Sequence, residues 1–299
     1  MDQKNNRCRV AVMLLTASLI PIGTASLGPA APAEATVEPD SLVLDGHGYG
    51  HGVGLSQYGA LGYALNFGWS AGQILDHFYG GTVAATAPNT DITVRLNAHD
   101  GAIQTAVVHD KGAVVVDGLA GGPWRSLAAR EMSAGHYAVW ARSDGNVCPA
   151  STTDLDDPSN GWTKVVADAP LVTFRTQADV AASPDVADLI GLCEPTTGRV
   201  RHYRGSIRAV NSSSGANRTV SQLPVEQYVR SVVAGEMSAG WAAMGGGKGA
   251  QALQAQAVAA RSYALVESRE PYAKTCDSNC QTYRGAAYRA GVAGAIVAQ

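Results

Sequence analysis

The chain has 299 residues, which is long enough for one large or two modest domains with a sizeable core. Its formal net charge is −3 and charged residues make up 16% of it, so the composition argues against a polyanion-binding surface and no nucleic acid is expected as a partner. The 34 glycines and the low charge are typical of a turn-rich secreted protein, and they suit a neutral polymer better than an ionic ligand.

The first forty residues have the pattern of a secretory signal. A positive leader with Lys4, Arg7 and Arg9 precedes a short apolar run over residues 10–20, and two small-residue cleavage sites follow within 31–35. We therefore expect a signal peptide over residues 1–35 and a secreted mature protein. The apolar run is short for a bilayer span, so no stable membrane span is expected after cleavage, and an uncleaved anchor is the alternative.

Four cysteines remain in the mature chain once Cys8 leaves with the signal: Cys148, Cys193, Cys276 and Cys280. In an oxidising compartment an even number favours two disulfides, and the simplest of the three connectivities joins Cys148 to Cys193 and Cys276 to Cys280. The alternative is a metal site that combines Cys276 and Cys280 with a histidine from elsewhere. No histidine lies near this pair in the sequence, so disulfides are favoured and no metal is predicted.

A glycine-rich stretch over residues 45–60 follows the leader and reads Asp-Gly-His-Gly-Tyr-Gly-His-Gly-Val-Gly-Leu-Ser-Gln-Tyr-Gly-Ala. Glycine at this density allows a ligand to approach the main chain closely. His47, His51, Ser56 and Gln57 are then displayed with little cover, which is typical of a binding loop. A flexible linker, a metal-binding histidine pair and a phosphate loop are the alternatives, and the last lacks the lysine and the preceding strand of such loops.

Two short helices are predicted between Gln57 and Gly80, because apolar residues recur there at helical spacing. They are separated at Gly68. Ser70 followed by Gln73 has the pattern of a capping box and predicts the start of the second helix.

From Asp91 to about Asn217 the sequence changes to short β-rich runs that turn residues divide at short intervals. This pattern predicts an antiparallel sheet or a barrel-like module. The runs are Ile92–Leu96, Thr105–Val108, Ala113–Val116, His136–Trp140, Lys164–Val166, Leu171–Phe174 and Arg204–Val210.

One peptide occurs twice in similar form, because Arg125–Gly135 shares eight of eleven residues with Arg230–Gly240. Two copies do not make a repeat architecture. In the first copy Arg130 precedes Glu131, so we expect this carboxylate to be ion-paired. We attribute the likeness to chance or to a local duplication.

Two further helices are predicted after residue 223. Pro224 suits a first helical position, and Val225–Met237 has the apolar spacing of an amphipathic helix. The second helix is Lys248–Glu267, whose small-residue face allows another helix to pack closely and consists of Ala250, Leu253, Ala257, Val258, Ala264 and Leu265. Within it, Arg261 is a candidate buried hydrogen-bonding anchor, and a solvated position is the alternative.

Glu236 is the one acidic residue in the otherwise uncharged stretch Ser231–Trp241. A lone carboxylate without a neighbouring cation is what a general acid with a raised pKa requires. Its place near the C-terminal end of the predicted helix disfavours a negative charge, which raises a carboxylate's pKa modestly. An ordinary acid at a helix end is the alternative.

The chain resembles the SpoIID/LytB family of sporulation stage II protein D-like lytic transglycosylases and amidase enhancers. Four segments carry the resemblance: Gly50–Ala60, Leu223–Met237, Ala250–Ala264 and Cys280–Gly285. They read Gly-His-Gly-Val-Gly-Leu-Ser-Gln-Tyr-Gly-Ala, Leu-Pro-Val-Glu-Gln-Tyr-Val-Arg-Ser-Val-Val-Ala-Gly-Glu-Met, Ala-Gln-Ala-Leu-Gln-Ala-Gln-Ala-Val-Ala-Ala-Arg-Ser-Tyr-Ala and Cys-Gln-Thr-Tyr-Arg-Gly.

The chain departs from the family pattern in three places. The Gly-His-Gly motif precedes the Gly-Glu-Met motif here, whereas it follows in most members. Residues 242–249 are inserted before the second helix. The sequence stops at Gln299, where the family usually continues, so a truncated C-terminus is expected.

The resemblance implies an α+β fold, in which a β-rich antiparallel module, short helices and the Ala-rich helical pair form a glycan-binding cleft. We expect one SpoIID-like domain over residues 36–299 with a β-rich insertion at about 90–217. The expected partners are peptidoglycan glycan strands and a cell-wall amidase, and the expected location is extracellular or cell-wall associated.

The implied activity is that of a peptidoglycan lytic transglycosylase, which needs a single acid and no cofactor. Glu236 is the expected catalyst, with His51, Ser56 and Gln57 as contacts to the sugar and Arg261 and Tyr263 as supports. Two alternatives are open: a non-catalytic peptidoglycan-binding enhancer of an N-acetylmuramoyl-L-alanine amidase, and a zinc protein that uses His47, His51 and cysteines.

Overall fold

The structure is a computed structural model that describes residues 8–12, 42–46, 52–102, 104–194, 196–211, 215–267 and 277–298. It divides the chain into two compact units, Met1–Ser56 and Gln57–Gln299. In the first unit, β1 (Cys8–Val12) pairs antiparallel with β2 (Leu42–Gly46). β1 falls within the expected leader, whose cleavage stays a prediction.

The second unit begins with two helices, α1 (Gln57–Phe67) and α2 (Ala71–Phe78). Gly68 separates them with a φ of 68°, a backbone conformation that favours glycine. The Ser70 hydroxyl accepts a hydrogen bond from the backbone N–H of Gln73, and the Gln73 side chain accepts one from the backbone N–H of Ser70. The predicted break and capping box are therefore confirmed.

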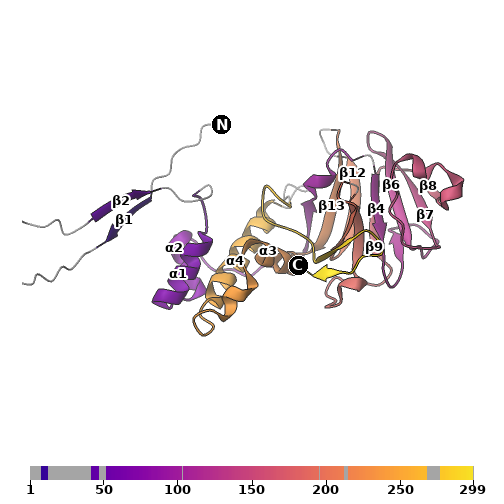
Figure 1. Cartoon of the computed structure of the whole chain (residues 1–299). Coiled ribbons are helices and arrows are strands. Elements are labelled where there is room, and N and C mark those ends of the chain that lie inside the picture. The colour runs from indigo at the N-terminus through magenta and orange to yellow at the C-terminus, as the bar shows by residue number, and fades with distance from the viewer. Residues whose placement is uncertain are drawn as a thin grey trace, which may run out of the picture. The chain divides into compact units, whose positions relative to one another are not determined.

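Two sheets form the β-rich part of this unit (Figure 1), with strand orders β15-β14-β11-β10-β4-β6-β7-β8 and β3-β13-β12-β9-β5. All neighbouring strands in them run antiparallel. The strands are β3 (Asp91–Arg95), β4 (Gln104–Val108), β5 (Val114–Val116), β6 (Ser126–Ser133), β7 (His136–Arg142), β8 (Thr163–Ala169), β9 (Leu171–Thr176), β10 (Ile190–Glu194), β11 (Arg199–Tyr203), β12 (Ser206–Asn211), β13 (Asn217–Pro224), β14 (Ala287–Ala290) and β15 (Val297–Ala298). Short 3₁₀ helices lie between them: η1 (Asn97–His99), η2 (Thr153–Leu155), η3 (Pro158–Asn160) and η4 (Val186–Asp188).

The seven β-rich runs all coincide with strands, and the structure adds β6, β10 and β11 within the same region. The run expected over Arg204–Val210 begins later, at Ser206, because Gly205 turns the chain with a φ of 80°. β13 begins at Asn217 and joins the five-stranded sheet. β14 and β15 follow α4 and join the eight-stranded sheet, whose other strands precede α3.

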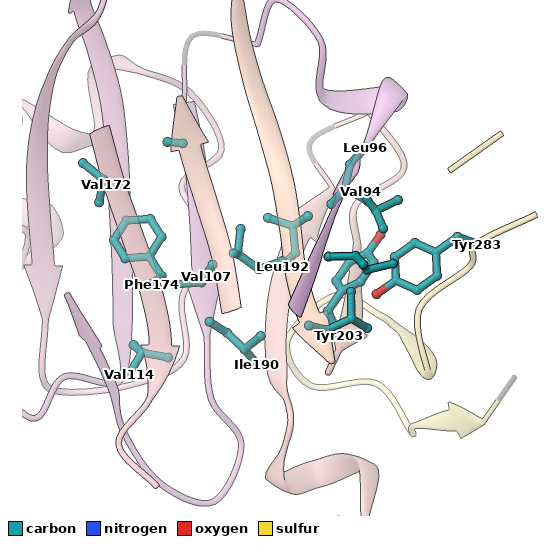
Figure 2. Close-up of a cluster of buried hydrophobic side chains, with 14 of the residues drawn as sticks. Val94, Leu96, Val107, Val114, Val172, Phe174, Ile190, Leu192, Tyr203 and Tyr283 are labelled. Carbon is teal, nitrogen blue, oxygen red and sulfur yellow. The ribbon is translucent and has the colours of Figure 1, made fainter. Parts of the chain in front are cut away.

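The core lies between the two sheets (Figure 2). Val94 and Phe174 come from the five-stranded sheet, Val107 and Leu192 from the eight-stranded sheet, and all four side chains are fully buried. Burial of each such side chain stabilises the fold by about 1.5–3 kcal/mol. Tyr228, from the helix that carries Glu236, belongs to the same core, so the sheets anchor this helix.

The remaining helices are α3 (Val225–Glu236), η5 (Ala239–Ala243) and α4 (Ala250–Glu267). α4 contacts α1, α2 and α3, and Figure 1 shows the four helices grouped beside the sheets. The face of α4 that packs is made of small residues: Ala252, Ala255, Ala260 and Ala264. The α+β prediction is confirmed.

Three details of the helix predictions are wrong. Pro224 is the last residue of β13 and precedes α3. α4 begins at Ala250 and not at Lys248, because the glycines at 245–247 turn the chain with positive φ. Val258 is exposed and not packed, since it lies away from the face that the four buried alanines define.

Candidate active site

The carboxylate of Glu236 is held from both sides at the C-terminal end of α3. Its Oε2 accepts a hydrogen bond of 2.8 Å from the Gln57 amide nitrogen, and its Oε1 accepts one of 2.6 Å from the backbone N–H of Thr282. The side chain is half-buried, and among the described residues no lysine or arginine forms an ion pair with it. Two neutral donors therefore fix the carboxylate, which remains partly accessible to solvent.

Gln57 is the first residue of α1 and comes from 179 positions upstream of Glu236. α1 and α3 both have α4 as a neighbour, which brings the start of one helix to the end of the other. The structure thus joins two residues that the sequence predicted for the same site.

Gly235 explains how the backbone of residue 282 reaches Glu236. A Cβ at Gly235 would collide with the carbonyl oxygen of Thr282, so the loop can run along α3 only over a glycine. Ser231, one helical turn earlier, donates a hydrogen bond of 2.5 Å to the carbonyl of Gly285 and holds the far end of the loop. Gly235 therefore allows the loop to approach α3 closely, and the next residue, Glu236, accepts a hydrogen bond from this loop.

Two buried tyrosines hold the loop in place through their hydroxyl groups. Tyr228 donates a hydrogen bond of 2.7 Å to the Gln281 side chain, and the hydroxyl of Tyr283 lies 3.1 Å from that of Ser221. Burial raises the pKa of both tyrosines well above its usual range, and Glu236 is among the neighbours that raise the pKa of Tyr228 further. Figure 2 shows Tyr283 beside Tyr203 at the edge of the core. No sequence pattern predicted these supports, although Tyr228, Gln281 and Tyr283 lie within the segments that carry the resemblance.

The other candidate sugar contacts in the glycine-rich stretch are less defined. His51 and His47 lie outside the described residues. Ser56 is exposed and is the last residue of the first unit. Their roles stay predictions.

Arg261 pairs with the opposite end of α3 from Glu236. Its Nε and Nη2 donate hydrogen bonds of 2.7 and 2.8 Å to the carboxylate of Glu226 in the first turn of α3. Ten residues along a helix correspond to about 15 Å, so this pair ties α4 to α3 away from the Glu236 carboxylate. Tyr263 is exposed two residues further along α4. The structure brings neither side chain into hydrogen-bond contact with Glu236.

Arg261→Ala is expected to lower the free energy of unfolding by less than about 1 kcal/mol at pH 7, because both partners are solvent-accessible. The hydrogen bond from Arg261 lowers the pKa of Glu226 below its ordinary 4.5. The contribution of the pair is therefore present above pH 4.5 and is lost as the pH falls through the lowered pKa. Urea unfolding should separate the parent and the variant at pH 7, and the difference should shrink as the pH falls below 4.5. A larger difference at low pH would contradict the assignment.

Cys148 and Cys193 form a disulfide with a Cα–Cα distance of 5.7 Å, which is the pairing expected for these two residues. Cys280 is also disulfide-bonded, and Cys276 lies outside the described residues, so their pairing stays a prediction. In the described part of the chain, no three His, Cys, Asp or Glu side chains are grouped to hold a metal ion.

Glu131, the counterpart of Glu236 in the similar peptide, has a different environment. It lies in β6 and accepts hydrogen bonds from the backbone N–H of Gly135 and the side chain of Asn211. Arg130 pairs instead with Asp156, so the expected ion pair with Glu131 is wrong. The reason is geometric: neighbouring residues of a strand point to opposite faces.

An open groove of about 510 Å³ lies between α3 and α4. Val229, Arg230 and Val233 line it from α3, and Leu253 and Ala257 line it from α4. Ala239, three residues after Glu236, also lines it. The glycan-binding cleft expected at the helical pair stays a prediction.

Among the described residues, no helix combines the length and the apolar character needed to cross a bilayer. No curated protein and no solved structure matches the chain. A family model described as SpoIID, Stage II sporulation protein, matches residues 213–297, which contain α3, α4, Glu236 and Thr282. Over this segment the chain is similar to the SpoIID family.

Proposed function

We propose that this protein is a peptidoglycan lytic transglycosylase, a lyase that cleaves the bond between N-acetylmuramic acid and N-acetylglucosamine with Glu236 as its single acid and base. The match of residues 213–297 to the SpoIID family model supports a role at the cell wall. The observation that carries the proposal is the pair of neutral N–H donors that fixes the half-buried carboxylate of Glu236. Glycan strands are the proposed substrate, and the proposed location is outside the cell.

The chemistry needs one carboxyl group and no water. The protonated Glu236 gives its proton to the glycosidic oxygen, and the bond from this oxygen to C1 of the muramic acid breaks. The C6 hydroxyl of the same sugar attacks C1, and its proton passes to the Glu236 carboxylate. The acid is restored, and the product has a 1,6-anhydro end. A hydrolytic glycosidase would instead use a second carboxyl group and consume a water molecule.

The two oxygens of Glu236 are suited to different tasks. Oε1 faces a backbone N–H, which can only donate, so this oxygen remains an acceptor throughout the cycle. Oε2 faces a side-chain amide, which has both a donor and an acceptor end. Gln57 can therefore pair with Oε2 whether or not it carries the proton, and we assign the proton transfers to Oε2.

The proposal is tested with purified peptidoglycan incubated with the protein in water labelled with heavy oxygen. We expect muropeptides that are lighter than the hydrolysis product by one water and contain no label, as detected by mass spectrometry. Labelled reducing ends would show hydrolysis and contradict the single-acid route.

Binding of glycan without any product would contradict catalysis and favour the alternative, an enhancer of a cell-wall amidase. This outcome is checked by adding an N-acetylmuramoyl-L-alanine amidase and measuring whether its rate rises in the presence of the protein. The two functions therefore give separate readouts on the same purified substrate.

A further inference from the structure

Two aromatic side chains lie beside the Gln57–Glu236 contact and have no role in the chemistry above. The ring centroids of Tyr58 and Trp241 are 5.1 Å apart, and their planes are inclined by 59°. Tyr58 is 78% exposed and Trp241 is partly buried. When a ligand covers the face of an aromatic ring exposed to this degree, the binding is stabilised because apolar surface is removed from water.

The segment that begins at Gln57 and the segment over residues 236–241 make two contacts with each other. Gln57 donates to Glu236, and the next residue, Tyr58, touches Trp241, which follows Glu236 by five positions. Gln57 and Tyr58 are neighbours with Cα atoms about 3.8 Å apart, so the two contacts start from adjacent residues of α1.

The backbone of Trp241 is fixed by two hydrogen bonds and a close contact. Its N–H donates to the carbonyl of Ser238, and its carbonyl accepts from the N–H of Met244, each at 3.0 Å. A Cβ at Gly249 would collide with the Trp241 carbonyl, so this turn is wedged against the start of α4. A ring on such a fixed backbone loses little conformational freedom when it binds a ligand.

The surroundings of the two rings carry no charge in the sequence. Residues 52–75 and 237–247 contain no Asp, Glu, Lys or Arg. An ionic ligand would find no counter-charge on these segments, whereas a sugar ring presents an uncharged face of C–H groups that suits an aromatic surface.

We propose that Tyr58 and Trp241 form a stacking platform for one sugar ring of the glycan, next to the bond that Glu236 cleaves. This inference rests on the proposed function and names the part of the site that holds the neutral sugar. The platform explains how a site with a single carboxylate recognises a polymer of low charge. Both residues are positioning residues, because they hold the sugar and take no part in the proton transfers.

The platform is tested in a Glu236→Gln background, where binding is measured without turnover. Tyr58→Ala and Trp241→Ala are each expected to weaken binding to purified glycan strands and to a soluble chito-oligosaccharide about tenfold. Tyr58→Phe keeps the ring and should bind within about twofold of the parent. Phe67→Ala removes another exposed ring, 70% exposed at the far end of α1, and serves as the matched control with unchanged binding.

Unchanged binding in Tyr58→Ala would overturn the platform, and this surface variant decides the matter even where Trp241→Ala fails to fold. Equal losses in Tyr58→Phe and Tyr58→Ala would assign the effect to the hydroxyl and also overturn stacking. Binding is measured without turnover, so the platform can be confirmed even if the protein forms no anhydro product. Normal product release by an active protein with Tyr58→Ala and unaltered glycan affinity would leave the proposed function and remove the platform.

Discussion

Glu236→Gln is expected to lower the release of 1,6-anhydro ends by at least about a hundredfold, because the amide cannot supply the proton that the leaving oxygen needs. The substitution keeps the shape of the side chain, and its carbonyl oxygen can still accept the hydrogen bond from Thr282. Binding of glycan should therefore survive. The measurement is the initial rate of anhydro-muropeptide release, compared with binding of the same strands.

Glu131→Gln is the matched control for this variant. Glu131 lies in the same Glu-Met-Ser-Ala-Gly sequence, but β6 carries it and its partners are Gly135 and Asn211. The same chemical change at this position should leave the rate within about twofold. A comparable loss in both variants would show that the effect comes from destabilisation, and would remove Glu236 from the catalytic role.

Local sequence patterns predicted the elements whose signals lie within a few residues. The capping box at Ser70 and the helix break at Gly68 depend on side chains and a φ angle that their own segments supply. The alternating apolar runs predicted their strands in the same way. The ends of α4 and β12 were less accurate because turns at glycine set them.

The two similar peptides show that a local sequence pattern does not by itself determine the structure. Arg125–Gly135 and Arg230–Gly240 share eight of eleven residues, yet the first contributes β6 and the second contributes the end of α3. Tertiary contacts decide between the two conformations: β6 pairs with β4 and β7, whereas α3 packs on the core through Tyr228 and Val232. A short sequence therefore predicts neither the structure nor the role of its glutamate.

The site itself depends on contacts across long stretches of the chain. Glu236 was predicted as the catalyst from its uncharged surroundings, and Gln57 was placed with it only through the family resemblance. The hydrogen bond from the backbone of Thr282 could not be predicted, because a main-chain donor has no signature in the sequence. Arg261 was expected as a hydrogen-bonding support, and its carboxylate partner Glu226 became evident only from the packing of α4 on α3.

Gly235→Ala is expected to damage the site without touching any polar group. In an open helix, alanine in place of glycine stabilises by about 0.5–1 kcal/mol. At this position the added methyl group would collide with the Thr282 carbonyl, and overpacking of this kind costs about 1–3 kcal/mol. The backbone N–H of Thr282 would move away from Oε1 of Glu236, and a displacement of about 1 Å can lower a catalytic rate on the order of a hundredfold.

Gly62→Ala is the control, because Gly62 lies within α1 and nothing approaches its Cβ position within 4 Å. It should raise the free energy of unfolding by about 0.5–1 kcal/mol and leave the rate unchanged. Urea unfolding and the anhydro-muropeptide assay, applied to both variants, therefore separate helix propensity from the close approach. If Gly235→Ala were as stable and as active as Gly62→Ala, the loop at Thr282 would not be what holds the Glu236 carboxylate in place.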